Sequence, residues 1–148
     1  MWLYPAKDLL FYSADIHGNL MARQRIAVLR RLMEDREGVV VTTMDGLMDH
    51  LLPLKYLREQ SITVESGQVI DLDVWKERLI AMGYERVAQV DGMGQFSIRG
   101  GIVDIFPLTE EVPVRIELWD DEVDSIRTFD LESQRSVEQL ENITIYPA

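Results

Sequence analysis

The chain has 148 residues, of which 47% are hydrophobic and 28% charged, a balance typical of a globular protein with a buried core. It has no cysteine, which excludes disulfide bonds and thiolate metal sites and is consistent with a cytoplasmic location. No apolar run approaches the roughly 20 residues that cross a bilayer, so we expect no membrane association.

The net charge of −11 is unevenly distributed along the chain. Residues 1–56 carry seven basic and seven acidic side chains, whereas residues 57–148 carry eight basic and nineteen acidic ones. A surface this acidic repels the phosphate backbone of a nucleic acid. The charge pattern therefore disfavours nucleic-acid binding by the second part of the chain and favours a protein partner.

Residues 1–56 are expected to form part of an α/β layer. Asn19 is a candidate N-cap for a helix over residues 20–36, in which the apolar residues recur on one face. Residues 38–43 (GVVVTT) predict a short strand buried on both sides, and residues 44–52 predict a second helix. Alternating strands and helices are typical of a parallel sheet, but these elements are too few for a complete one. We therefore expect the chain to begin inside a larger domain.

Residues 57–138 are expected to form a separate α+β module. A strand over residues 61–66 precedes a helix that Asp71 caps and Gly83 ends. Beyond the helix, apolar residues alternate with a period of two, which predicts an antiparallel sheet with the helix packed on one side. The predicted strands cover residues 85–90, 95–99, 101–106, 114–119 and 122–129. Residues 139–148 are expected to return towards the first layer.

Two strands of the predicted sheet carry polar residues on the side away from the helix. In residues 96–106 (FSIRGGIVDIF), a two-residue hairpin turn at Gly100-Gly101 places Arg99 on that side, and the competing geometry, a bulge at the glycines, does the same. In residues 114–119 (VRIELW), aliphatic residues alternate with polar ones and a tryptophan. The residues expected to face outward are Ser97, Arg99, Ile102, Asp104, Phe106, Arg115, Glu117 and Trp119.

This alternation leaves two interpretations open. In the first, Arg99 and Arg115 pair with Asp104 and Glu117, another part of the chain covers Trp119, and the residues are structural. In the second, the outer side of the sheet binds a protein partner, because tryptophan and arginine are the residues most enriched at binding hot spots.

Catalytic and metal sites are not expected. The acidic run 120–122 lies between two predicted strands, where adjacent carboxylates point in different directions and a solvated turn is the simpler interpretation. GMGQFS (92–97) lacks the third glycine of a dinucleotide site, and no phosphate-binding GxxxxGK[ST] occurs in the sequence. His17 and His50 have no metal-binding spacing. We therefore expect no catalytic residue, metal or cofactor in this chain.

Two stretches carry a family resemblance, GQFSIRGGIVDIFP (94–107) and PVRIELWDDEVDSIRTFD (113–130), and SQRS (133–136) follows them. They resemble the module shared by the bacterial transcription-repair coupling factors (Mfd) and the excision-repair protein UvrB. The first third is also similar to the coupling factors, over residues 3–20, 23–32 and 39–53. Because the longer, tyrosine-rich insertion of UvrB is absent, the chain resembles an N-terminal fragment of a coupling factor, with the corresponding fragment of UvrB as the alternative.

The resemblance implies a function that the alternation alone does not. In this family the module binds UvrA, the damage-recognition ATPase, and residues 1–56 correspond to part of a degenerate UvrB-like, helicase-type α/β domain. The full family protein is an ATP-dependent translocase on double-stranded DNA, with ATP and magnesium in its motor domains, which displaces stalled RNA polymerase and recruits nucleotide-excision repair. The implied UvrA-binding residues are Arg99, Arg115 and Trp119, the last in place of a common phenylalanine, with Ser97, Asp104, Phe106 and Glu117 as neighbours on the same face.

Overall fold

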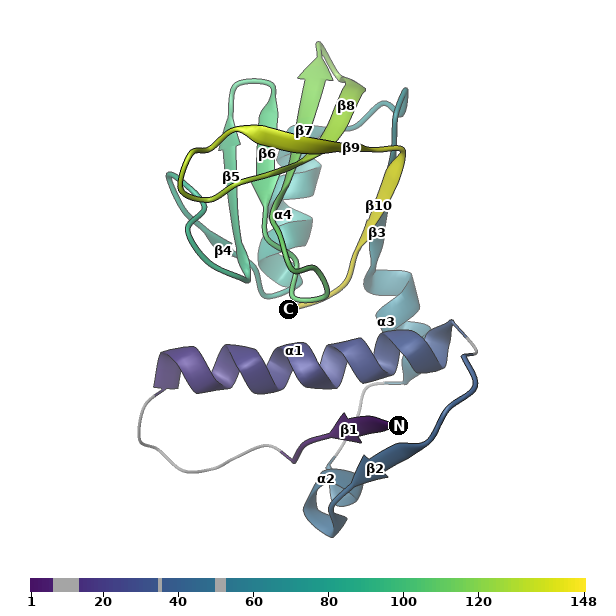
Figure 1. Ribbon diagram of the computed structural model, residues 1–148. Coiled ribbons are helices and arrows are strands. Elements are labelled where there is room, and N and C mark those ends of the chain that lie inside the picture. The colour runs from purple at the N-terminus through teal and green to yellow at the C-terminus, as the bar shows by residue number, and fades with distance from the viewer. Residues whose placement is uncertain (7–13, 35, 50–52) are drawn as a thin grey trace. The chain divides into compact units, whose positions relative to one another are not determined.

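The computed structural model describes residues 1–6, 14–34, 36–49 and 53–148, with the backbone only for residues 14–19. The chain forms two compact units, Met1–Glu59 and Gln60–Ala148, which we describe separately (Figure 1). Helices combine with a mainly antiparallel sheet, which confirms the α+β class. None of the helices in the described residues has both the length and the apolar character needed to cross a bilayer.

The first unit contains a strand–helix–strand element. β1 (Trp2–Tyr4) pairs in parallel with β2 (Val40–Thr42), and α1 (Ala14–Met33) lies between them in the chain. Ile26 and Leu29 of α1 are buried, as the apolar stripe of the predicted helix indicates. The parallel pairing agrees with the layer expected from the sequence.

Two details of the first unit differ from the expectation. α1 begins at Ala14, so Asn19 lies inside the helix and does not cap it. Asparagine costs less than about 1 kcal/mol inside a helix, so the helix extends further than an asparagine cap predicts. Val40 and Val41 are exposed and not buried on both sides, because β2 pairs only with β1 in the described sheet.

Two short helices follow β2. α2 (Met44–Met48) has Thr43 as its N-cap, with Oγ1 accepting a backbone hydrogen bond at 3.1 Å. The predicted helix extends to residue 52, but residues 50–52 lie outside the described part of the chain. α3 (Leu54–Gln60) is not apparent from the sequence, where Pro53 indicates a stop. Proline also fits the start of a helix, because the first amides of a helix have no partner in it.

The second unit is built on a six-stranded sheet in which only β4 and β5 are parallel neighbours. In spatial order, its strands are β4 (Glu85–Arg86), β5 (Gln95–Arg99), β6 (Ile102–Ile105), β7 (Val114–Trp119), β8 (Glu122–Phe129) and β9 (Ser136–Leu140). Strands β5 to β8 agree closely with the prediction. The predicted strand over residues 85–90 shortens to two residues, because the chain leaves the sheet after Arg86 and buries Val90 on another part of the unit.

The main core of the second unit lies between the six-stranded sheet and α4 (Leu72–Ala81), which Figure 1 shows behind the sheet. Asp71 caps α4 as predicted, since its Oδ1 accepts hydrogen bonds from two amides of the first turn at 3.0 and 3.3 Å. A two-stranded sheet of β3 (Ile62–Glu65) and β10 (Asn142–Ile145) completes this core. Buried core residues include Trp75, Leu79, Val103, Ile105, Ile116, Ile126, Ile143 and Ile145.

The last residues of the chain therefore lie with the second unit, although the sequence places them with the first layer. β10 pairs with β3, and Ile143 and Ile145 are buried in the core of the second unit. The Tyr84 hydroxyl donates a hydrogen bond to the Tyr146 carbonyl at 2.7 Å. Alternating apolar residues predict that one face of a strand is buried, but they do not indicate which hydrophobic core that face joins.

Gly100 and Gly101 form a hairpin turn, which decides between the two geometries that the sequence leaves open. Arg99 on β5 pairs directly with Ile102 on β6, so the two glycines alone make the turn. Gly100 has a φ of +59°, a conformation that glycine adopts without a steric penalty. The hairpin keeps the strands in a register that sends Arg99 to the side of the sheet away from α4.

Candidate protein-binding face

The predicted binding residues share the side of the six-stranded sheet that faces away from α4. Asp104 on β6 lies directly between Ser97 on β5 and Arg115 on β7, and cross-strand neighbours point to the same side. We call this side the arginine face; its predicted residues are Ser97, Arg99, Asp104, Phe106, Arg115, Glu117 and Trp119. The sequence therefore identifies the shared side correctly.

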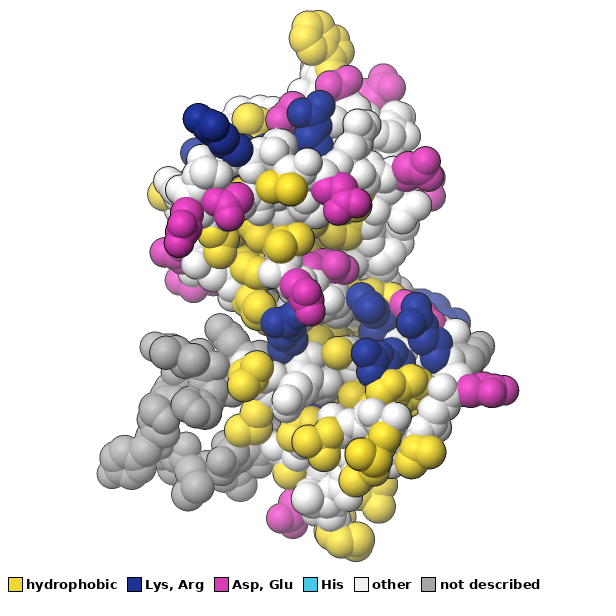
Figure 2. Space-filling model, in the orientation of Figure 1, with side chains coloured by type: hydrophobic (Ala, Val, Ile, Leu, Met, Phe, Trp, Pro, Cys, Tyr) yellow, Lys and Arg dark blue, Asp and Glu magenta, His cyan; other side chains and the backbone are white. Residues whose placement is uncertain are grey.

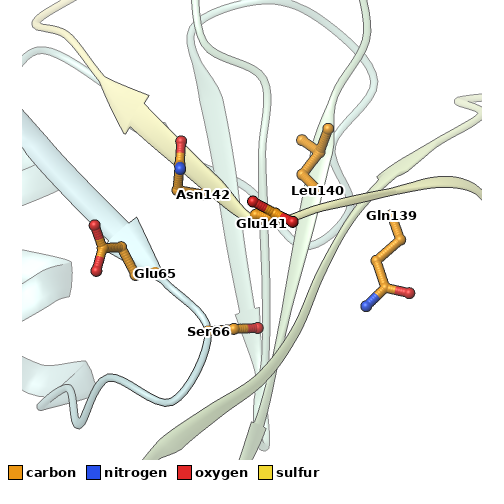
Figure 3. A pocket seen from close by; sticks show the side chains of 6 residues that line it. All are labelled: Glu65, Ser66, Gln139, Leu140, Glu141 and Asn142. Carbon is orange, nitrogen blue, oxygen red and sulfur yellow. The ribbon is translucent and has the colours of Figure 1, made fainter.

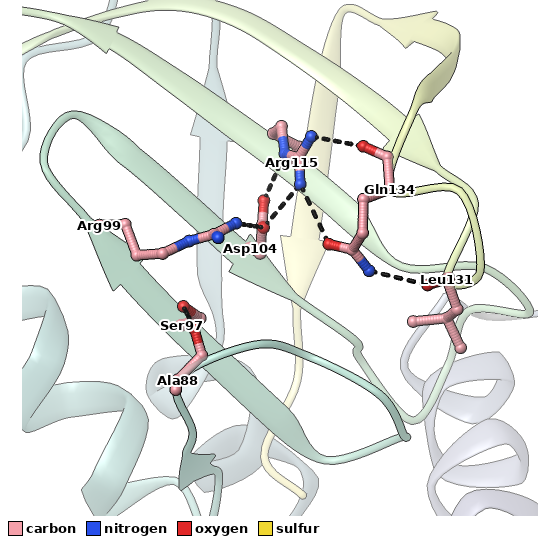
Figure 4. Close-up of polar contacts among 7 residues, drawn as sticks. All are labelled: Ala88, Ser97, Arg99, Asp104, Arg115, Leu131 and Gln134. Atoms are coloured by element: carbon pink, nitrogen blue, oxygen red, sulfur yellow. Dashed lines mark hydrogen bonds and ion pairs between the residues drawn. The ribbon is translucent and has the colours of Figure 1, made fainter.

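The arginine face is not open to water along its whole length. Ser97, Asp104 and Phe106 are all buried, so the expectation that they face solvent is wrong. Phe106 forms a small second core with Val90 and Phe129. The segment after β4 covers this part of the sheet, and the Ser97 hydroxyl donates a hydrogen bond to its Ala88 carbonyl at 3.0 Å (Figure 4).

Asp104 is the centre of a charged cluster in which one carboxylate binds two arginines (Figure 4). The Arg115 guanidinium donates from Nε to Oδ1 at 2.7 Å and from Nη2 to Oδ2 at 2.8 Å. Arg99 Nη2 donates to Oδ2 at 3.1 Å. The side chain of Asp104 is 1% exposed, that of Arg115 13% and that of Arg99 50%. The trio carries one surplus positive charge, and Arg99 is the member that presents it to water.

Arg115 is fixed from several directions. Its Nη1 donates to the Gln134 carbonyl at 2.9 Å, and its guanidinium carbon lies 4.6 Å from the centre of the Phe129 ring. The hydrogen bond to Asp104 raises the pKa of Arg115 above its ordinary value, so the side chain stays charged. This geometry confirms the pairing of Arg115 with Asp104 that the first interpretation of the sequence describes, and it suits a structural clamp.

Trp119 stands at the end of β7, where it is 81% exposed. Arg99 on β5, Ile102 on β6 and Glu117 on β7 lie opposite one another, so the backbones of Arg99 and Glu117 are two strand spacings apart, about 10 Å. Trp119 is two residues beyond Glu117, about 7 Å further along β7. The tight turn that follows includes Asp120, with a φ of +59°, and its carboxylates are exposed as the sequence predicts. An indole and a guanidinium are therefore accessible on the same side of the sheet, within reach of one partner surface.

A family model, that of the UvrB interaction domain, matches residues 62–148, which is more than half of the chain. The chain belongs to the UvrB interaction domain family. The match begins at the first residue of β3 and runs to the end of the chain, so the UvrB interaction domain coincides with the second unit. The matching family is one of interaction domains, which agrees with a binding and not a catalytic role for this unit.

The similarity to whole proteins extends beyond the UvrB interaction domain into the first unit. Proteins named transcription-repair-coupling factor from Staphylococcus aureus (strain MRSA252) and Staphylococcus haemolyticus (strain JCSC1435) are 38% identical over 148 residues, all of this chain. The Bacillus subtilis (strain 168) protein of the same name is 41% identical over 146 residues, 99% of this chain. The chain spans only 13% of the length of the two staphylococcal relatives and 12% of the Bacillus one.

Gln134 is a site residue of the UvrB interaction domain that the alternation of the sequence does not reveal. Its φ is +59°, and its carbonyl accepts from Arg115 while its Nε2 donates to the Leu131 carbonyl at 2.8 Å (Figure 4). It lies in a turn, where strand periodicity gives no information. The only sequence signal for it is its place in SQRS, the stretch that carries part of the family resemblance.

A separate polar pocket lies where β9 turns into β10, near the end of β3 (Figure 3). Its lining residues are Glu65, Ser66, Gln139, Leu140, Glu141 and Asn142. None of them is a predicted site residue. Among the described residues no three His, Asp or Glu side chains gather to hold a metal ion, while His50 and the side chain of His17 lie outside the described part.

Proposed function

We propose that the second unit is the module by which a transcription-repair coupling factor docks on UvrA, and that its role is to bind a protein and not to catalyse a reaction. The observation that carries the proposal is an exposed tryptophan and a half-exposed arginine, Trp119 and Arg99, on the same side of one sheet in a UvrB interaction domain. Both residue types are enriched at hot spots, and a fixed scaffold lowers the entropy that binding costs.

Similarity over the first unit favours a coupling factor over UvrB as the parent protein. The coupling factors match residues before 62 as well as after it, whereas the UvrB interaction domain model begins at residue 62. For the longer parent protein we propose the activity that the resemblance implies, namely ATP-dependent translocation on double-stranded DNA, displacement of stalled RNA polymerase and recruitment of nucleotide-excision repair. No residue of this chain is assigned to ATP, magnesium, DNA or polymerase.

The proposal assigns different tasks to the two arginines. Arg99 donates charge-assisted hydrogen bonds to a carboxylate of UvrA, since Asp104 is the one hydrogen-bond partner found for it among the described residues. Arg115 supports this contact from inside the domain, because it is almost buried and clamped to Asp104. Trp119 supplies the apolar anchor. Glu117, partly exposed between them, lies at the rim of the contact.

Titration of UvrA with the chain and its single variants tests the proposal. Arg99→Ala and Trp119→Ala should each weaken binding by about 2 kcal/mol, roughly 30-fold, if they are hot spots. Arg86→Ala and Val74→Ala are matched controls, because they remove an exposed arginine on β4 and an exposed apolar side chain on α4, and should change the affinity by less than about twofold. Unchanged affinity for both Arg99→Ala and Trp119→Ala would reject the arginine face as the docking site.

A further inference from the structure

Arg127 on β8 is a further arginine on the arginine face that neither the sequence pattern nor the family resemblance singles out. It pairs directly with Arg115 on β7 in a regular stretch of that ladder, and with Gln139 on β9 just before the register shift between Arg127 and Phe129. Cross-strand neighbours point to the same side of a sheet, so Arg127 lies on the side away from α4. Its side chain is exposed.

The contacts of the unit do not account for an arginine at this position. Like charges directly opposite each other in a sheet are destabilising, and Arg127 lies opposite Arg115. Asp104 neutralises Arg115, but no ion pair or hydrogen bond of the Arg127 side chain is found among the described residues. Its neighbour on β9 is the uncharged Gln139. Arg127 therefore adds a second positive charge beside the surplus charge of the Asp104 trio.

The distribution of charge in the second unit points to the kind of partner that this strip fits. Residues 60–148 contain seven basic and eighteen acidic side chains, and Figure 2 shows few basic groups among many acidic ones on the visible face of the unit. Three of the seven, Arg99, Arg115 and Arg127, lie on the arginine face. The acidic remainder would repel the uniformly charged phosphate backbone of a nucleic acid, whereas a protein can place carboxylates opposite the arginines and neutral or basic groups opposite the acidic residues.

We infer that Arg127 is a second partner-contacting arginine, which binds a carboxylate of the docked protein separate from the one that binds Arg99. β5 and β8 are three strand spacings apart, about 15 Å. One partner carboxylate could therefore bind both Arg99 and Arg127 only if their side chains bent towards each other. Arg115 lies between the two and is held inward by Asp104. The inference rests on the proposed docking of UvrA on this face and adds a contact to it.

The test compares Arg127→Ala, Arg127→Lys, Arg99→Ala and the control Arg86→Ala in titrations with UvrA. Arg127→Ala removes the proposed charge-assisted contact and should lower the affinity for UvrA roughly tenfold. The affinity of Arg127→Lys should lie between those of Arg127→Ala and the unmodified chain, because lysine keeps the charge but not the planar pair of donors. Arg86→Ala removes the same charge from β4 and should change the affinity by less than about twofold. Thermal unfolding of each variant should give an unchanged midpoint, which checks that a loss of binding does not come from a loss of folding.

The outcomes separate the inference from the proposed function. Weakening by Arg127→Ala but not by Arg86→Ala, with unchanged unfolding, supports the inference. Equal weakening by both variants would show a general effect of net charge and overturn it. Weakening by Arg99→Ala with no effect of Arg127→Ala overturns the inference and leaves the proposed docking in place. Unchanged affinity for Arg127→Ala, Arg99→Ala and Trp119→Ala overturns both.

Discussion

The Asp104 cluster predicts that its two arginines differ sharply in their importance for folding. We consider two variants, Arg99→Ala and Arg115→Met, of which the second keeps a long unbranched apolar side chain next to Phe129. Arg115 makes two hydrogen bonds of 2.7 and 2.8 Å to a carboxylate that is 1% exposed, whereas Arg99 makes one of 3.1 Å from a side chain that is 50% exposed.

These distances and exposures fix the expected magnitudes. Arg115→Met leaves the buried Asp104 with only the half-exposed Arg99 as a partner, and breaking a buried ion pair costs about 3–5 kcal/mol. Arg99→Ala leaves Asp104 with its two shortest bonds, so the free energy of unfolding should fall by less than about 1 kcal/mol. The double variant Asp104→Asn/Arg115→Met should be more stable than the sum of its single effects predicts, by about 2 kcal/mol, because no buried charge is left unpaired and Arg99 is half-exposed to water.

Urea unfolding followed by the fluorescence of Trp75 provides the assay. Trp75 is buried in the core of the second unit, and replacing Trp2 and Trp119 by phenylalanine leaves it as the sole indole of the chain. The reasoning is refuted if Arg99→Ala destabilises as much as Arg115→Met, or if the effects of Asp104→Asn and Arg115→Met simply add.

Two further predictions concern single residues of the second unit. Burial raises the pKa of Tyr84 above its ordinary value of 10.0, so as pH rises this hydroxyl loses its proton in the unfolded chain before it does in the folded one. The contribution of Tyr84 to the free energy of unfolding should therefore be complete below pH 10 and should decrease as pH rises above it. Tyr84→Phe should flatten this decline and cost about 1–3 kcal/mol at pH 7, because the hydrogen bond from the Tyr84 hydroxyl to the Tyr146 carbonyl is lost. An unchanged alkaline profile in urea titrations would contradict this. Gly100→Ala should cost about 1 kcal/mol in the same assay through its φ of +59° alone, since nothing lies within 4 Å of the added Cβ; an unchanged free energy of unfolding would show that the turn relaxes.

The sequence predicts which side of the sheet a residue occupies better than it predicts whether that residue is exposed to solvent. Alternation along β5, β6 and β7 places Arg99, Asp104 and Arg115 together, and the structure confirms this placement. Alternation says nothing of what covers a side, because that depends on segments distant in the chain. Val90 belongs to a run that resembles a strand, yet it folds over the sheet beside Phe106, and this closes part of the face that was expected to be open.

The first unit shows the same limit in another form. A run of valines predicts a buried strand, but burial requires neighbours on both sides, and β2 has one strand neighbour in the described sheet. Local signals with a direct mechanism are more reliable, as the cap at Asp71 and the turn at Gly100 show. Both depend on the conformation of a few adjacent residues and not on the rest of the chain.

The pairing of Asp104 with Arg115 also has a consequence for how the hairpins assemble. In the native alignment of β6 and β7, the carboxylate faces a guanidinium, with Val103 opposite Ile116 and Ile105 opposite Val114. A slip of one residue between β6 and β7 would set Asp104 against an aliphatic side chain of β7 and leave this buried carboxylate with only the half-exposed Arg99 as a counterion. Misaligned sheets are thereby penalised by several kcal/mol, so a single ion pair selects the correct strand alignment while the protein folds.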